Sequence, residues 1–363
     1  MTNPIRLGII GCGEVAQLIH LPTLHHLRSL FTVTAVCDVS PKVRDAVGTR
    51  WGVMDRFADH HALLAHGEID AVLVANPNPF HAETARDAMR AGKHVMIEKP
   101  MCMTLAEADM LLAEEQASGR VVQVGYMRRH AAAFTEAKQS LQSMTDIRLA
   151  RVHAVIGRNA LIIGELADVV RPTDLPPSSA EALRTAAAER TVAAIGSAPE
   201  TLQSAYALLL GLSSHDLSAM RDLLGVPARV LYAASRGVDG RAISAAFDYG
   251  GFVCQFETLV DSIPRFDSHI EVYTPGRVLR VEYDTPYVRG IPGRIVTDDV
   301  GADGLARHTV RHAWKDSFEI EWRNFHDNVA GNRRPAMSLS DAREDLVLFR
   351  EMIECMRHAV TFR

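Results

Sequence analysis

The sequence lacks several features that would mark a chain for nucleic acid, membranes or secretion. It has no basic tract, because 39 basic and 44 acidic residues are mixed along 363 positions and leave a formal net charge of −5. A nucleic-acid or acidic-membrane partner is therefore not indicated. No apolar run reaches the roughly 18 residues that a membrane span needs. The first residues hold one Arg and a short apolar run, without the longer apolar region of a secretory signal.

Cysteine is scarce, and no paired spacing is present. The five cysteines, an odd number, are scattered without a CxxC pair, which predicts reduced thiols and a cytoplasmic location. The 16 histidines show no HExxH spacing and no cysteine partners, so we expect no metal site. Five of them are interpreted as ordinary helix-surface or core residues, namely His20, His25, His26, His60 and His61.

The composition that is present, 47% hydrophobic and 23% charged, is that of a globular chain whose length predicts about two domains. Its first third alternates apolar runs with helical patterns. Strands are expected at residues 5–10, 32–39, 71–75, 94–97 and 121–126. Helices are expected at 14–27, after Ser40-Pro41, up to Gly92, and from a Thr104–Glu107 capping box to Gly119. Such apolar strands separated by helices predict a doubly wound parallel α/β sheet, covered on both faces.

The pattern changes after Met127. From Ala228 onward strands follow one another directly, with hairpins expected at 242–260 and at 268–283. Two helices, at 316–329 and 340–359, are expected to close the chain, and residues 171–201 are expected to form a mobile excursion carrying one helix. We therefore predict a second α/β domain over residues 128–363, with a mostly antiparallel open sheet, for substrate binding and oligomerisation.

A glycine-rich turn follows the first predicted strand. Gly11-Cys12-Gly13-Glu14-Val15-Ala16 fits G-x-G-x-x-(G/A) between a strand and a helix, which is the setting in which this motif binds a dinucleotide. The first Gly permits the tight turn, and the second lets a pyrophosphate approach the helix N-terminus. The small third residue allows close packing of helix and strand. The alternative is a tight turn that binds nothing.

An acid, Asp38, ends the second predicted strand, about 20 residues beyond the motif, where it can bind both ribose hydroxyls and repel a 2′-phosphate. We therefore predict an N-terminal Rossmann domain over residues 1–127 that binds NAD. Lys42 and Arg44 on the next helix weaken this preference and leave NADP open. The alternative for Asp38 is a surface acid at a strand end.

Glu98-Lys99-Pro100 follows the fourth predicted strand. Ligands of an open parallel sheet bind outside the carboxyl ends of its strands, so Lys99 is expected at the cofactor crevice, with Pro100 keeping its backbone extended. A cation there would stabilise the alkoxide that forms as an alcohol is oxidised. The alternative is an ordinary exposed lysine.

These motifs resemble the glucose–fructose oxidoreductase, inositol dehydrogenase and rhizopine catabolism (Gfo/Idh/MocA) family. The resemblance covers nearly the whole chain, in order, through the glycine turn, "AVCDVS", "NPNPFHAE", "MIEKP", "QVGYMRR" and "SSHDLSAMRDLLG". It implies NAD(P)-dependent oxidation or reduction of a sugar, polyol or inositol-like alcohol by a homodimer or homotetramer. It also implies that Lys99 contacts substrate and nicotinamide ribose and that His215 is the general base. An imidazole pKa of about 6.5 suits that role.

One family position differs in this sequence. The family commonly has Asp four residues before the histidine, where this chain has Gly211. Asp216, next to His215, is expected on another helix face and so does not replace that acid directly. Either another acid enters the site, or the substrate needs less help, or catalysis is weak.

The candidate residues follow from these motifs. Those for the cofactor are Gly11, Gly13, Glu14, Val15, Ala16, Asp38, Asn76, Pro77, Asn78, His81, Glu98 and Lys99. Those for the substrate are Lys99, Tyr126, Arg128, Arg129 and His215, of which Lys99 and His215 are catalytic. A solvated surface cation is the alternative for each arginine, and weaker candidates are His153, Arg158 and Asn159. Two other functions stay open: a lyase or glycosidase that oxidises a sugar carbon transiently, and a nucleotide-binding sensor without turnover, which Gly211 motivates.

Overall fold

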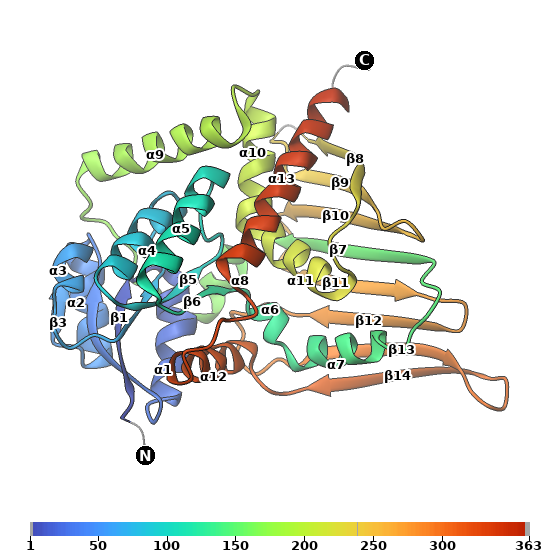
Figure 1. Ribbon diagram of the computed structural model, residues 1–363, viewed down its shortest axis with the longest axis horizontal. Coiled ribbons are helices and arrows are strands. Elements are labelled where there is room, and N and C mark those ends of the chain that lie inside the picture. The colour runs from blue at the N-terminus through green and yellow to red at the C-terminus, as the bar shows by residue number, and fades with distance from the viewer. Residues whose placement is uncertain (1–2, 238, 360–363) are drawn as a thin grey trace. The chain divides into compact units, whose positions relative to one another are not determined.

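The computed structural model describes residues 3–237 and 239–359, which form two compact units (Figure 1). Unit 1 comprises Met1–Tyr126, Ala167–Gly196 and Glu321–Leu346. Unit 2 comprises Met127–Leu166, Ser197–Ile320 and Val347–Arg363. A second domain was predicted over residues 128–363, but Ala167–Gly196 and Glu321–Leu346 lie in unit 1.

Unit 1 is built on a six-stranded parallel sheet, which confirms the predicted doubly wound fold. The strand order is β3-β2-β1-β4-β5-β6, so the order reverses beside β1, where such sheets bind ligands. The strands are β1 Ile5–Ile10, β2 Phe31–Cys37, β3 Asp55–Phe57, β4 Ala71–Val74, β5 His94–Glu98 and β6 Val122–Gly125. Strand β3 was not predicted, because three residues that are exposed or half-buried show no apolar run.

The helices of unit 1 begin and end at the expected local signals. Ser40 caps α2 by accepting from the Val43 amide, Thr104 and Glu107 form the predicted capping box of α5, and Gly119 ends α5 with a φ of 61°. The predicted first helix appears as a π-helical segment, η1, followed by α1. The segments are η1 Ala16–His20, α1 Leu21–His26, α2 Pro41–Trp51, α3 His60–Leu64, η2 Asn78–Phe80, α4 His81–Arg90, α5 Leu105–Ser118 and α9 Pro177–Ile195.

Two segments late in the chain belong to unit 1 because long-range contacts hold them there. The side-chain amide of Gln17 donates through Nε2 to the Val170 carbonyl and accepts through Oε1 from the Val170 amide (2.9 Å each). Trp322 is fully buried, and its ring packs against that of Phe31 with the ring centroids 5.2 Å apart. The predicted 171–201 excursion does carry one helix, α9. No local pattern reveals these contacts, because the partners are separated by 153 positions or more.

Unit 2 holds an eight-stranded sheet in the order β14-β13-β12-β11-β7-β10-β9-β8. Among the described strands of this sheet only β7 and β10 pair in parallel, so the predicted mostly antiparallel sheet is confirmed. Side chains along β7 alternate between buried and more exposed, so one sheet face forms a core and the other is partly solvated. The strands are β7 Leu149–Gly157, β8 Arg229–Arg236, β9 Ala242–Asp248, β10 Val253–Asp261, β11 Phe266–Tyr273, β12 Arg277–Tyr283, β13 Gly293–Val300 and β14 Ala306–Ala313.

The remaining helices complete unit 2 and the end of the described chain. Those within unit 2 are α6 Met127–His130, α7 Ala132–Leu141, α8 Asn159–Leu166, α10 Glu200–Leu208, the π-helical η3 Leu209–Ser213 and α11 Ser214–Leu224. The two closing helices are confirmed as α12 (Ser317–Ala330) and α13 (Leu339–Ala359), each of which begins in one unit and ends in the other.

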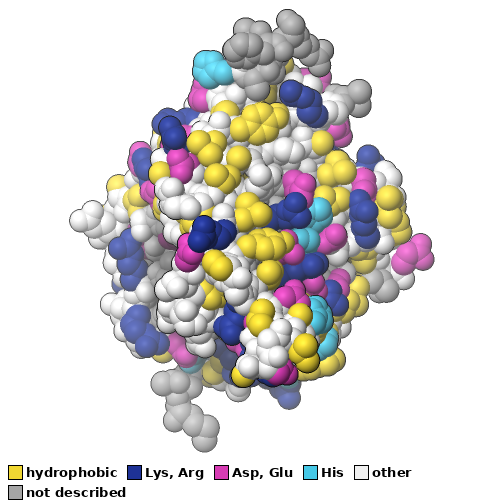
Figure 2. Space-filling model, turned by 90° about the vertical axis from the view of Figure 1, so that its right-hand side faces the viewer, with side chains coloured by type: hydrophobic (Ala, Val, Ile, Leu, Met, Phe, Trp, Pro, Cys, Tyr) yellow, Lys and Arg dark blue, Asp and Glu magenta, His cyan; other side chains and the backbone are white. Residues whose placement is uncertain are grey.

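The distribution of surface charge and the character of the helices agree with the mixed charge and the short apolar runs of the sequence. On the face drawn in Figure 2, basic and acidic side chains are mixed rather than gathered into patches of one sign. None of the helices within residues 3–237 and 239–359 combines the length and the apolar character that a bilayer crossing requires.

We predict that Thr104→Ala lowers the free energy of unfolding by about 1 kcal/mol, because the Glu107 amide loses its acceptor at the start of α5. Chemical denaturation followed by circular dichroism measures the change. The matched control is Thr49→Ala, at an exposed position inside α2, which should change stability by less than about 0.5 kcal/mol. Equal losses in the two variants would contradict the capping role.

Candidate active site

Gly11 occupies a turn after β1 in which no side chain fits. Its φ is +95°, and a Cβ atom there would lie 2.4 Å from backbone atoms of Ala75 and Asn76. Its amide donates to the Cys37 carbonyl at the end of β2 (2.9 Å). The turn is thus held between the carboxyl ends of β2 and β4.

Gly13 has a different environment. Among the described residues, no heavy atom lies within 4 Å of the position that its Cβ would take, whereas Ala16, the third small residue, is buried. The first glycine is required by packing, while the second keeps open the space in front of the helix that begins at Glu14. A pyrophosphate needs this space to approach the free N–H groups of a helix. The residues therefore fit a dinucleotide.

The Asp38 carboxylate lies directly beside this turn. It accepts hydrogen bonds from the amides of Cys12 (2.9 Å) and Ser40 (2.8 Å). The acid and the glycine turn are therefore close together, as their joint pattern predicted. Both cations on α2 have polar partners of their own: Lys42 donates to a threonine hydroxyl, and Arg44 pairs with the neighbouring acid.

The Glu98 carboxylate, at the end of β5, is engaged on both oxygens. Oε1 lies 2.8 Å from His20 Nε2, and Oε2 accepts from the Lys99 amide (3.1 Å). Burial acts to raise the pKa of Glu98, but the contact with His20 and the nearby groups of Lys99 and His81 together outweigh it, so that pKa lies below its usual value. Glu98 is therefore an ionised group that orders the backbone of Lys99. His20, interpreted from the sequence as an ordinary helix-surface or core residue, is buried, but its contact with Glu98 was not predicted, since a lone histidine on a helix carries no distinguishing signal.

His81, at the start of α4, connects the loops that follow β4 and β5. Its Nδ1 lies 2.7 Å from the Pro100 carbonyl and its Nε2 lies 2.6 Å from the Asn76 carbonyl. Burial lowers the pKa of His81, and a neutral ring donates to one of these carbonyls at a time. The side-chain oxygen of Asn76 is buried and has no hydrogen-bond partner among the described residues. This oxygen is available to a ligand, whereas His81 serves the protein itself.

The other predicted residues of unit 1 have definite places. Pro77 and Asn78 lead into η2 in the loop after β4, and the Lys99-Pro100 peptide bond is cis. Tyr126, after β6, is buried and donates to Asp345 (2.6 Å). The structure gathers half of the twelve predicted cofactor residues at the carboxyl edge of one sheet, namely Gly11, Gly13, Asp38, Asn76, Glu98 and Lys99.

In unit 2, His215 lies on α11 and is followed by a buried acid. Asp216 pairs with Arg128 and accepts from the Ser268 hydroxyl on β11 (3.0 Å). Burial raises the pKa of Asp216, and Arg128 opposes the shift. These contacts show that Asp216 anchors the helix that carries His215. That Asp216 does not replace the family acid directly stays a prediction.

Arg128 and Arg129 are only 3% and 7% exposed, so neither is the solvated surface cation that was weighed as the alternative. Arg129 Nε lies 3.2 Å from Asp222 on α11, and Lys138 binds the same carboxylate (2.5 Å). Burial acts to raise the pKa of Asp222, but these two cations outweigh it and the pKa lies below its usual value. Both arginines therefore stabilise α11, and a substrate contact by either stays a prediction.

Gly211 lies in η3, directly before α11. No heavy atom of the described residues lies within 4 Å of its Cβ position, and its φ is not in the left-handed region. A larger side chain would fit there. Packing therefore does not explain why this chain lacks the carboxylate that the family commonly has.

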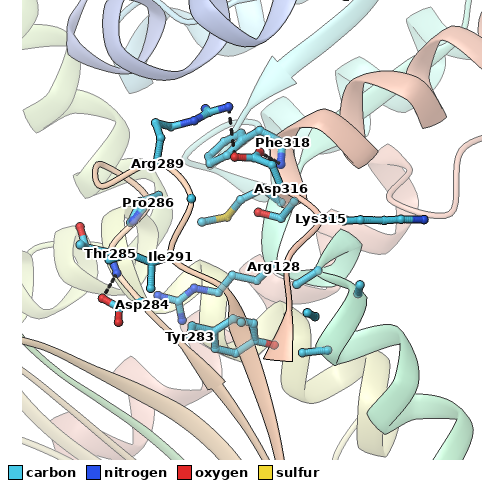
Figure 3. Close-up of a pocket in the computed structure, with 18 of the residues that line it drawn as sticks. Arg128, Tyr283, Asp284, Thr285, Pro286, Arg289, Ile291, Lys315, Asp316 and Phe318 are labelled. Carbon is cyan, nitrogen blue, oxygen red and sulfur yellow. Dashed lines mark hydrogen bonds and ion pairs between the residues drawn. The ribbon is translucent and has the colours of Figure 1, made fainter. Parts of the chain in front are cut away.

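A pocket of about 80 Å³ lies within unit 2 beside Arg128 (Figure 3). The guanidinium lies 5.0 Å from the centre of the Tyr283 ring. Three buried atoms of the lining, Arg128 Nε, Tyr283 Oη and Thr285 Oγ1, have no hydrogen-bond partner among the described residues. Such groups are costly unless satisfied, so we expect ordered water or a small polar ligand in this pocket.

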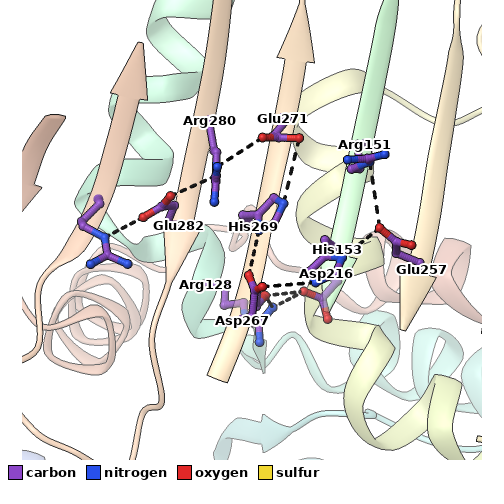
Figure 4. Close-up of polar contacts among 12 residues, drawn as sticks. Arg128, Arg151, His153, Asp216, Glu257, Asp267, His269, Glu271, Arg280 and Glu282 are labelled. Carbon is purple, nitrogen blue, oxygen red and sulfur yellow. Dashed lines mark hydrogen bonds and ion pairs between the residues drawn. The ribbon is translucent and has the colours of Figure 1, made fainter. Parts of the chain in front are cut away.

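A network of ion pairs covers the partly solvated face of the unit 2 sheet (Figure 4). His153 and His269 lie opposite each other on β7 and β11, with ring centroids 4.8 Å apart. Glu257 lies 2.8 Å from His153, and Asp267 lies 3.1 Å from His269. His153, a weaker candidate in the sequence, therefore belongs to a cross-strand network on this face.

One group among the described residues has donor atoms close enough to hold a metal ion. Asp59, His60 and His61 bring one donor atom each within 4.8 Å of one another. His60 Nε2 also lies 3.2 Å from Asp87, so ion pairing accounts for part of the grouping. The expected absence of a metal stays a prediction.

Comparison with known proteins agrees with this geometry. Residues 5–126 match the model of the Gfo/Idh/MocA oxidoreductase family, described as having an NAD-binding Rossmann fold. An inositol 2-dehydrogenase/D-chiro-inositol 3-dehydrogenase of Shouchella clausii is 36% identical over 140 residues, which cover 38% of this chain and 40% of that protein. An inositol 2-dehydrogenase of Salmonella typhimurium is 31% identical over 147 residues, with 38% and 42% covered. The matches span about two fifths of the length of these relatives.

Solved structures resemble nearly the whole chain in fold. A 3-ketoreductase of Actinomadura kijaniata, solved with NADP and TDP-benzene, has a TM-score of 0.73 at 22% identity and covers 98% of each chain. A structure from Desulfitobacterium hafniense has a TM-score of 0.78 at 16% identity, covering 99% of this chain and 97% of that one. At these identities the likeness shows the two-unit fold and no more.

The two glycines of the turn yield a paired prediction. Gly11→Ala should unfold or strongly destabilise the protein, because the new Cβ would overlap the backbone at Ala75 and Asn76. Gly13→Ala should leave the melting temperature unchanged and weaken coenzyme binding about tenfold or more, because its Cβ occupies the open space. Thermal unfolding and titration with NADH separate the two effects. Full coenzyme affinity in Gly13→Ala would show that no pyrophosphate approaches this residue.

Proposed function

We propose that this chain, whose residues 5–126 match the model of the Gfo/Idh/MocA oxidoreductase family, is an NAD(P)-dependent dehydrogenase or reductase of that family. Its substrate would be a secondary alcohol or ketone of a sugar, polyol or inositol-like compound. The observation that carries the proposal is the arrangement in unit 1 of an open position at Gly13, the Asp38 carboxylate beside it, and the ordered turn that bears Lys99.

The cofactor residues have separate roles in this proposal. Gly13 leaves room for the diphosphate, Asp38 binds the adenosine ribose, and the Asn76 side-chain oxygen accepts a hydrogen bond from the coenzyme. A bound nicotinamide dinucleotide supplies the acceptor or donor of a hydride. The Asp38 carboxylate would repel a 2′-phosphate, which supports NAD as the preferred coenzyme.

Two side chains handle the charge and the proton at the substrate oxygen. The Lys99 ammonium stabilises negative charge on that oxygen as its proton leaves. The His215 imidazole accepts the hydroxyl proton during oxidation and returns it during reduction. Unit 2 would bind the substrate, with Tyr126, Arg128 and Arg129 as further predicted contacts. Because their polar groups already bond to carboxylates, any such contact would be shared with those acids.

The substrate class is supported by the relatives. Inositol dehydrogenases align with 38% of the chain, and the 3-ketoreductase that shares the fold was solved with NADP and TDP-benzene. A polyol or sugar with adjacent hydroxyls is therefore the first class to test.

A second candidate is a nucleotide-binding sensor without turnover. Gly211 motivates it, because the family position for an acid holds no side chain although the space is open. NADH formation across a panel of cyclic polyols and sugars would exclude it. A lyase or glycosidase with transient oxidation would instead consume substrate without stoichiometric NADH.

Two further proposals concern the location of the protein and its oligomeric state. All five cysteines are free thiols in this structure, which supports the reduced cytoplasmic location expected from their spacing.

We also propose that the chain forms a homodimer or homotetramer through the sheet of unit 2, since one face of that sheet is only partly covered. Light scattering measures the oligomeric state.

We predict that His215→Ala lowers kcat about 10²-fold or more while the dissociation constant for NADH stays unchanged, because only proton transfer is removed. Absorbance of reduced nicotinamide measures turnover, and fluorescence titration measures binding. His308→Ala, an exposed histidine on β14, is the control and should behave as wild type. Unchanged turnover in His215→Ala would remove the general base from the proposal.

We predict that Asp38→Ala shifts coenzyme preference from NAD toward NADP by about tenfold or more, because the repulsion of a 2′-phosphate is lost. The ratio of the two dissociation constants measures the shift. Asp109→Ala removes an exposed acid of α5 that pairs with Arg343, and should leave the ratio unchanged. An unaltered ratio in Asp38→Ala would place the adenosine ribose elsewhere.

A further inference from the structure

A buried polar chain in unit 1 leads to the turn that carries Lys99. Trp322 Nε1 donates to His20 Nδ1 (3.1 Å), and His20 Nε2 lies 2.8 Å from the Glu98 carboxylate. Trp322 and His20 are fully buried, and the Glu98 side chain is 12% exposed. The three residues come from the first helix, a strand end and a segment about 300 positions away.

The chemistry of this chain determines where the ring proton lies. An indole N–H can only donate, so His20 Nδ1 must be the acceptor and must be unprotonated. The single proton of the neutral ring then sits on Nε2, from which it points at Glu98. Trp322 thereby selects one tautomer, and that tautomer binds the carboxylate.

The Glu98 carboxylate, once oriented by His20, in turn holds the backbone of the next residue. Its second oxygen accepts from the Lys99 amide (3.1 Å), while the next residue is held from another direction, with the Pro100 carbonyl 2.7 Å from His81. The backbone on both sides of the Lys99 side chain is therefore tied to a buried histidine. Loss of the His20 bond would leave a buried carboxylate with one partner fewer and free to rotate.

We propose that His20 is a positioning residue for Lys99, and that Trp322 acts by fixing the tautomer of His20. The inference rests on the proposed function, because Lys99 is assigned there to the substrate oxygen. It goes beyond that function in naming two residues that touch neither coenzyme nor substrate. A displacement of about 1 Å in a reacting group is enough to cost about 10² in rate.

Packing alone is the competing explanation, and it predicts different consequences. Trp322 also contacts Phe31 and Phe325, with centroid distances of 5.2 Å and 5.7 Å. A packing role needs shape and burial but no particular tautomer. A positioning role needs one donor directed at Glu98.

The first experiment compares two variants of the full-length protein. His20→Gln keeps one donor and one acceptor, whereas His20→Phe keeps a ring but neither polar atom. We expect kcat close to wild type in His20→Gln and about 10²-fold lower in His20→Phe, with the NADH dissociation constant unchanged in both. Equal losses of kcat in the two variants would overturn the proposal.

The second experiment monitors the environment of the Lys99 side chain by NMR and does not require substrate turnover. The sequence has five lysines, so reductive ¹³C-methylation gives few NMR signals, and Lys99→Arg identifies that of Lys99. The Lys99 signal should move in His20→Phe and stay in place in His20→Gln. An unmoved signal in His20→Phe would overturn the proposal even if no alcohol is turned over, which separates its failure from failure of the proposed function.

The third experiment tests Trp322. Histidine ¹⁵N chemical shifts should report an Nε2–H tautomer for His20 in the wild type and a mixture of tautomers in Trp322→Phe. Phe325→Leu is the matched control, because Phe325 is equally buried in the same aromatic group and has no polar atom. That variant should lose stability but keep the tautomer. An Nδ1–H ring in the wild type would refute the assignment.

Discussion

The close approach of the Gly11 backbone to Ala75 and Asn76 is the constraint on which the candidate cofactor site depends. Strands β1, β2 and β4 are neighbours in a parallel sheet, so their carboxyl ends meet at one edge and leave no room for a side chain. The same convergence brings the Asp38 carboxylate to the Cys12 amide. The strand order therefore places the crowded position, Gly11, two residues before the open one, Gly13.

Both units use buried polar groups to hold the segments that carry the candidate catalytic residues. In unit 1, His20 and His81 bind the turn around Lys99. In unit 2, the carboxylates of Asp216 and Asp222 tie α11, with His215, to Arg128 and Arg129. Such bonds are costly to leave unmade, so they favour one geometry over its neighbours. The roles proposed for Lys99 and His215 each depend on the geometry within the unit that holds that residue.

Local signals predicted much of the fold. The caps at Ser40 and Thr104 and the left-handed end at Gly119 depend on a few adjacent residues, and each appears where expected. The hairpin around Gly250-Gly251 is formed by β9 and β10. Strand β3 was missed because it is short and half-exposed, and β7 was missed although its side chains alternate along the strand.

By itself the sequence determined the two sheets, the glycine turn with its acid, and the placing of Lys99 after a buried strand, because these depend on local composition and on spacing along one chain. The return of Ala167–Gly196 and Glu321–Leu346 to unit 1, the burial of Arg128, and the roles of His20 and Trp322 were decided by the tertiary structure alone. The physical reason is distance along the chain. A hydrogen bond between residues about 300 positions apart leaves no periodicity in either neighbourhood, and a histidine in a helix looks the same whether it faces water or a carboxylate.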